Sequence, residues 1–169
     1  MKRTIRRTVR YPHPPSRVWA ALTSSAAMAK WLMPNGFVPE VGHAFTFRTD
    51  PAPGFDGIVH CKVLQLQTER LMVWSWRGGP IDTIVEFRLE PDGDGTTLHF
   101  EQRGFEGLRA IMVSLILAGG FKKMCRELLP AVLDAMARGE EVQGVQPVCK
   151  DEPSRVEHVF AKLIEKMPS

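Results

Sequence analysis

The sequence predicts an α+β domain in which a curved, six-stranded antiparallel sheet wraps around one long C-terminal helix. Alternating apolar and polar residues over 43–103 are typical of strands, and the short turns between these runs favour antiparallel pairing. An apolar repeat of 3.6 residues from Phe121 to Met136 predicts a helix. Because a sheet with one apolar face must be covered, we expect this helix to pack against it.

The first elements are a strand and two short helices. Residues 4–11 form a strand that ends where Pro12, Pro14 and Pro15 remove backbone donors. A first helix begins near Ser16, and a second covers 26–32. The five basic residues within residues 1–11 predict a wet, charged strand face rather than a nucleic-acid site, because one strand offers few phosphate contacts.

Five further strands follow, over residues 43–49, 57–66, 71–76, 83–90 and 96–103. The clearest alternation places Thr83, Val85, Phe87 and Leu89 on one face. Two apolar stretches, 112–117 and 121–136, then have helical periodicity, and Pro130 is expected to kink the second or remove one hydrogen bond from it.

Composition points to an ordinary globular domain of one unit. The chain has 169 residues, 44% of them hydrophobic, and a formal net charge of +3. The longest apolar stretch, Ala110–Ala118, is far shorter than the roughly 20 residues that cross a bilayer. We expect no membrane partner, and the absence of a signal-peptide pattern predicts a cytoplasmic location.

Residues 1–139 are predicted to form the domain, and 140–169 a linker with a short amphipathic helix. The apolar stripe of that helix over 154–167 is costly to leave in water. It is therefore expected to pack back on the domain or to form a homodimer interface.

No metal, cofactor or catalytic centre is predicted. The three cysteines form no CxxC pair, and no two of the five histidines are three or four residues apart. Phosphate-binding and nucleophile-elbow motifs are absent, and no carboxylate pair suggests acid–base catalysis. His13 and His43 are expected at the surface, and the catalytic residues stay unknown.

The interior is the candidate site. Gln102 has the same parity as Phe100, so its amide should point inward and find a protein partner or a ligand. His60 is ambiguous, because either Ile58 and His60 or Val59 and Cys61 can take the inner face. Aromatic and methionine residues complete a set that is either plain core or the lining of an apolar pocket. The predicted ligand-binding set is Trp31, Phe45, Phe47, His60, Trp74, Trp76, Phe87, Phe100, Gln102, Met112, Phe121 and Met124.

An ordered set of segments carries a family resemblance. They are PPSRVWAALT, KWLMP, EVGHAFTFR, VLQLQTERLMVWSW, DTIVEFRLEPDGDGTTLHFEQRGF and GGFKKMCRELLPAVL. In this order they resemble the START-like (SRPBCC) superfamily with its helix-grip fold, and more closely the branch named for the C-terminal domain of the activator of heat-shock-protein-90 ATPase.

The resemblance implies a deep apolar pocket for a small hydrophobic molecule, without a defined reaction. It also leaves two alternatives: a protein-interaction module with a chaperone partner, and a cyclase- or hydrolase-type enzyme in the same cavity. Fold alone does not choose among these. The enzyme would require a buried polar cluster, with Gln102 and His60 as its first candidates.

Overall fold

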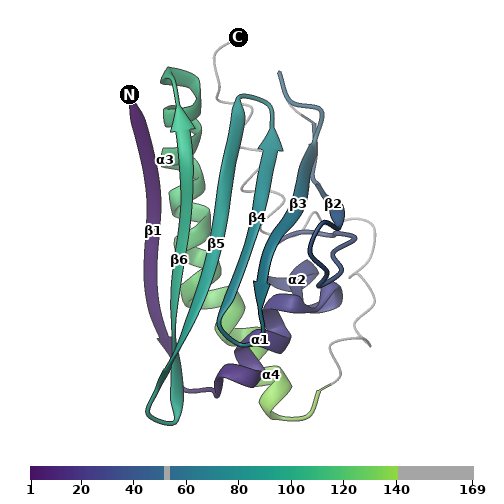
Figure 1. Ribbon diagram of the computed structural model, residues 1–169, viewed down its shortest axis with the longest axis vertical. Helices are drawn as coiled ribbons and strands as arrows, with labels where there is room; N and C mark the ends of the chain where they lie inside the picture. The colour runs from purple at the N-terminus through teal and green to yellow at the C-terminus, as the bar shows by residue number, and fades with distance from the viewer. Residues whose placement is uncertain (52–53, 141–169) are drawn as a thin grey trace.

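The computed structural model describes residues 1–51 and 54–140, and it confirms the α+β architecture. One antiparallel sheet has the strand order β1-β6-β5-β4-β3-β2, and the helices lie on one of its faces (Figure 1). The strands are β1 (Lys2–Tyr11), β2 (Ala44–Arg48), β3 (Ile58–Gln67), β4 (Leu71–Gly78), β5 (Ile81–Asp92) and β6 (Gly95–Glu106). Each lies within a few residues of its predicted range.

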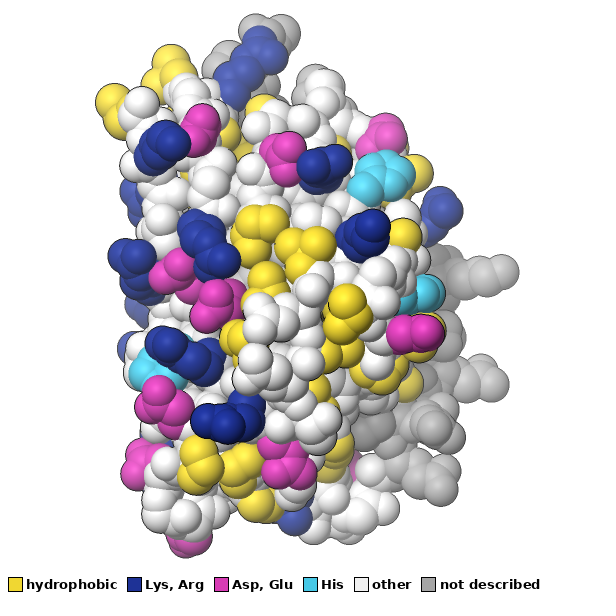
Figure 2. Space-filling view, in the orientation of Figure 1, with side chains coloured by type: hydrophobic (Ala, Val, Ile, Leu, Met, Phe, Trp, Pro, Cys, Tyr) yellow, Lys and Arg dark blue, Asp and Glu magenta, His cyan; other side chains and the backbone are white. Residues whose placement is uncertain are grey.

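The outer face of the sheet carries charged ladders, seen as neighbouring blue and magenta side chains over β1 and β6 in Figure 2. Arg6 pairs with Glu101 at 2.8 Å, and Arg103 pairs with Glu86 at 3.0 Å. The prediction of a wholly wet arginine face on β1 is wrong at Arg7, and Arg3, which has the same parity, has a buried Nε. Arg7 points inward, where its Nη2 donates to the carbonyl of Ala118 at 2.7 Å, because β1 is the sheet edge that runs beside α3.

The two short helices, α1 (Pro15–Thr23) and α2 (Ser25–Trp31), follow from local capping. Proline is at the start of α1, where its missing N–H costs nothing. The hydroxyl of Ser24 accepts the backbone N–H of Ala27 and caps α2. The indole of Trp31 is fully buried and donates to the carbonyl of Ala21 at 2.9 Å, which fixes one helix against the other.

The C-terminal helix is longer than predicted. α3 (Leu108–Lys123) continues through a π-helical turn (Met124–Leu128) into α4 (Leu129–Ala137). The two predicted stretches are therefore one helix, because Leu117 and Phe121 of α3 gain burial that outweighs the poor helix propensity of the intervening glycines.

Pro130 explains the π-helical turn. Its ring lacks an N–H and would crowd the carbonyl one turn earlier in a regular α-helix. The chain responds just before it, where the N–H of Leu129 bonds to the carbonyl of Met124 in the wider π spacing. The irregularity predicted at Pro130 is thus present, but it lies in the turn before the proline, Met124–Leu128.

The expectation that His13 is a surface residue is wrong. The proline-rich loop that contains it lies against α4, and the residue is 6% exposed. Its Nε2 lies 2.9 Å from Asp134 Oδ1, and its Nδ1 lies 3.1 Å from Arg17 Nη1. Because a guanidinium only donates, Nδ1 accepts and Nε2 donates, so His13 links α1 to α4.

In the described part of the chain, none of the helices combines the length and apolar character needed to cross a membrane. Apart from Glu140, the predicted linker over 140–153 lies outside the described residues, as does the predicted amphipathic helix over 154–167.

Candidate functional site

Ten of the twelve predicted ligand-binding residues lie together between the sheet and the helices. They are Trp31, Phe45, Phe47, Trp74, Trp76, Phe87, Phe100, Gln102, Phe121 and Met124, each no more than 5% exposed. Alternation along the strands explains this, because every second side chain points at the helical layer.

The aromatic rings form one continuous network across this interior. Phe100 on β6 lies between Phe87 on β5 and Phe121 on α3, with ring centroids 5.1 and 4.5 Å away. The network continues from Phe87 to Trp74 at 5.2 Å and from there to Phe45 at 5.6 Å. Rings at these separations and tilted orientations attract each other beyond simple burial, so the network stabilises the join between sheet and helix.

One polar chain crosses the aromatic interior. The Nε2 of Gln102 donates to Thr83 Oγ1 at 2.8 Å, and that hydroxyl donates to the carbonyl of Trp76 at 3.3 Å. Since the proton of Thr83 is committed to Trp76, Thr83 can only accept from Gln102, and this orients the amide. The Oε1 of Gln102 is then left without a hydrogen-bond partner among the described residues.

A second buried polar atom lies in the same row of the sheet. Trp74 is fully buried, and its Nε1 also lacks a partner within residues 1–51 and 54–140. Strand register pairs Trp74 with Val85 and Val85 with Gln102, so these three side chains share one row and one face. A buried polar group without a partner costs free energy, which marks this row as unusual in an apolar core.

His60 and Met112 do not join the interior. On β3, Val59 and Cys61 take the inner face, which resolves the ambiguity and places His60 outside. Met112 is 37% exposed on α3. The proposed enzymatic pair is not assembled, because Gln102 and His60 lie on opposite faces of the sheet.

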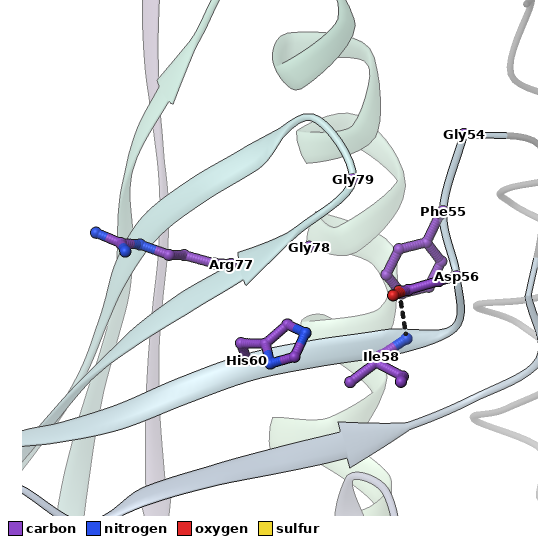
Figure 3. A pocket seen from close by; sticks show the side chains of 8 residues that line it. All are labelled: Gly54, Phe55, Asp56, Ile58, His60, Arg77, Gly78 and Gly79. Carbon is purple, nitrogen blue, oxygen red and sulfur yellow. Dashed lines mark hydrogen bonds between the residues drawn. The ribbon is translucent and has the colours of Figure 1, made fainter.

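The structure has an open hollow of about 450 Å³ where the start of β3 lies beside the end of β4 (Figure 3). It is lined by Gly54, Phe55, Asp56, Ile58, His60, Arg77, Gly78 and Gly79. Its charged groups already have partners: Arg77 donates to Asp82 at 3.0 Å, and Asp56 accepts the N–H of Ile58 at 3.0 Å. Of the predicted set only His60 borders this hollow, which lies away from the aromatic interior.

Three buried acidic groups resist ionisation. Burial raises the pKa of the Cys125 thiol to about 12, with Arg7 opposing the shift. Burial likewise raises the pKa of Cys61 and of Tyr11, whose hydroxyl donates to the Cys125 carbonyl at 2.6 Å. No cluster of three or more His, Cys, Asp or Glu side chains suited to a metal occurs among the residues that the structure describes.

These shifts predict alkaline instability. Each group stays protonated in the folded chain but ionises near its ordinary pKa of about 8.5–10 when unfolded. The unfolded state therefore loses protons first, so the stability that these three groups contribute is fully present below about pH 8 and is lost as the pH rises further. Tyr11→Phe should be less stable at pH 7 and decline less steeply above pH 9. Urea midpoints from pH 7 to 10.5 measure this, and parallel declines would refute it.

Strand periodicity predicted the inward position of Gln102 but not its hydrogen-bond partners. Thr83 was placed on the inner face of its strand, and it is the one hydroxyl in that alternating set. The sequence therefore offered a signal for Thr83 as a partner of Gln102. The unpartnered indole nitrogen of Trp74 had no counterpart in sequence, because hydrogen bonding in the interior depends on the packing of neighbouring strands.

The sheet, the paired short helices and the long helix that it grips define a START-like, helix-grip domain. A family model described as "Activator of Hsp90 ATPase homolog 1-like protein" matches residues 12–134. The chain belongs to this family. The fold supports a ligand-binding module or one that resembles an Hsp90 activator. No curated protein matches the chain.

Solved structures agree with this assignment. An X-ray structure from Mesorhizobium loti is 30% identical, with a TM-score of 0.68, and the match covers 78% of this chain and 97% of that one. A Bacillus halodurans solution structure is 22% identical, with a TM-score of 0.67, covering 79% and 99%. The solution structure of the Aha1 dimer from Colwellia psychrerythraea is 20% identical, with a TM-score of 0.59, covering 75% and 96%. The last two likenesses show the fold.

Proposed function

We propose that this protein binds an apolar or aromatic small molecule between the inner face of the sheet and the helix formed by α3 and α4. The observation that carries the proposal is the buried amide of Gln102, which lies on the same face of the sheet as the aromatic network and has one polar atom unpartnered by the described residues. Ligand pockets are typically lined by aromatic side chains with a few polar groups that orient the guest.

Entry of a ligand requires some interior side chains to move apart. Met124 is buried at the inner side of the π-helical turn, and its flexible thioether can adapt to different shapes. Turns of this kind are frequent at functional sites, because they interrupt the regular hydrogen bonding of a helix. The helical layer thus combines an adaptable side chain with an irregular backbone opposite the aromatic network.

Binding is tested with naphthalene, an apolar aromatic probe. The chain has four tryptophans, and each gives one indole N–H resonance in NMR spectra. Titration should shift the resonances of Trp74 and Trp76 saturably, whereas that of the half-buried Trp19 on α1 should hardly move. Trp74→Phe assigns the key resonance. Absence of saturable shifts, or shifts confined to the residues of the outer hollow, would contradict the proposal.

The family description favours a second candidate, a protein-interaction module that stimulates the ATPase of an Hsp90-class chaperone. It predicts faster ATP hydrolysis by such a chaperone when this chain is added, with no response to naphthalene. Self-association through residues 154–167 also stays a prediction. The Colwellia structure is described as a dimer, which supports self-association as such and does not bear on this segment.

A further inference from the structure

We infer that the ligand carries a hydroxyl group on its aromatic or apolar skeleton, and that Gln102 and Trp74 bind this hydroxyl together. The inference rests on the proposed function and adds the chemical class of the guest. Five buried side-chain atoms lack a hydrogen-bond partner among the described residues: Arg3 Nε, Arg7 Nε, Thr49 Oγ1, Trp74 Nε1 and Gln102 Oε1. The inference follows from the last two, a donor and an acceptor that share one row of the inner face.

The two unpartnered atoms have opposite hydrogen-bonding roles. Because the amide nitrogen of Gln102 is bonded to Thr83, the free atom is Oε1, which only accepts hydrogen bonds. The free atom of Trp74 is Nε1, which only donates. A guest that satisfies both must therefore donate one hydrogen bond and accept another.

The strand register places Trp74 and Gln102 in one row of the sheet. Trp74 and Gln102 are both in register with Val85, on the strands to either side of it. Their Cα atoms are thus about 10 Å apart, or two strand spacings. The side chain of Val85 between them is shorter than either and is 1% exposed. A single oxygen atom with two hydrogen bonds of about 2.8 Å can join groups placed in this way.

Charged groups and hydrocarbons do not satisfy both atoms. An ionised carboxylate only accepts, so it would leave Gln102 Oε1 unpartnered and would lose its hydration in an apolar interior. An ammonium group only donates, so it would leave Trp74 Nε1 unpartnered. A pure hydrocarbon satisfies neither atom. A neutral hydroxyl donates and accepts through one atom and meets both requirements.

The neighbouring row supplies the apolar surface. In this row Met72 pairs with Phe87, and Phe87 pairs with Phe100. The row lies two residues along each strand from the row of Trp74, Val85 and Gln102. Phe121 approaches Phe100 from the helical side at 4.5 Å. A ring attached to the bound hydroxyl would therefore lie against aromatic faces and edges, as offset aromatic pairs prefer. A phenol or a larger hydroxylated aromatic fits this combination.

The test compares three probes that share one skeleton: naphthalene, 2-methoxynaphthalene, which accepts but does not donate, and 2-naphthol, which does both. In the unmodified chain, 2-naphthol should bind about tenfold more tightly than naphthalene, as expected for two neutral hydrogen bonds made in place of unpartnered atoms. The methoxy compound should gain much less. Dissociation constants are measured from the indole resonances or by calorimetry.

Variants locate the hydroxyl. Gln102→Met keeps the length of the side chain and removes Oε1, and Trp74→Phe removes Nε1; each should reduce the preference for 2-naphthol to about threefold or less. Gln65→Leu changes an exposed glutamine on β3 and should leave the preference intact. The readout is a ratio of two affinities for the same variant, so a general loss of stability does not imitate the effect.

The outcomes separate the two proposals. Saturable binding of naphthalene and 2-naphthol with equal affinity would overturn the hydroxyl inference, while the proposed function stands. No binding of any probe would overturn the proposed function itself. A preference for 2-naphthol that persists in both Gln102→Met and Trp74→Phe would overturn the assignment to these residues.

Discussion

Replacing Phe100 with alanine is expected to lower the free energy of unfolding by about 3–5 kcal/mol. Phe100 is 1% exposed and lies between Phe87 on the sheet and Phe121 on α3. Its removal takes away buried apolar surface and leaves a void that the surrounding rings cannot fill. Chemical denaturation should show a lower midpoint with an unchanged slope.

A matched control is Leu64→Ala, which truncates a side chain that is 43% exposed on β3. Its effect should stay within about 0.5 kcal/mol, because little surface is withdrawn from the core. Losses of equal size in the two variants, or a loss below about 1 kcal/mol for Phe100→Ala, would show that the aromatic network does not hold the sheet to the helix.

Gly57→Ala is the second substitution with a large expected effect: it should lower the free energy of unfolding by at least about 2 kcal/mol. Gly57 precedes β3 and has a φ of +81°, which side chains with a Cβ rarely adopt. A Cβ atom there would lie only 2.3 Å from the carbonyl oxygen of Thr49. Since that obstacle is backbone, the connection from β2 to β3 would have to shift.

The control for this prediction is a glycine-to-alanine substitution that should raise stability. Gly119 lies within α3, and a Cβ atom there would meet nothing within 4 Å. Gly119→Ala should therefore raise stability by about 0.5–1 kcal/mol, because alanine loses less backbone entropy than glycine on joining a helix. Thermal unfolding of the two variants checks both. Stabilisation by Gly57→Ala would mean that the β2–β3 connection tolerates a side chain.

Much of the fold and part of the site follow from periodicity. The alternation that places Thr83, Val85 and Phe87 together also predicted which face Gln102 takes, and the structure agrees. On β3 the same reasoning was ambiguous, because Ile58 and Val59 offer both faces an apolar residue. The pairing of Cys61 with Trp76 on β4 turns His60 outward. Such register is set by a neighbouring strand and cannot be derived from one segment.

The errors have a common physical cause. The two predicted helical stretches form one helix because burial of α3 against the sheet outweighs the poor helix propensity of the glycines between them. His13 is buried because α4 presents Asp134 to it. By itself, the sequence determined the order of the elements and which side chains of each strand share a face, since both depend on local periodicity. Only the tertiary structure decided which atoms those faces meet, and so which polar atoms in the row of Trp74 and Gln102 lack a partner, because hydrogen bonding in a core depends on segments far apart in the chain.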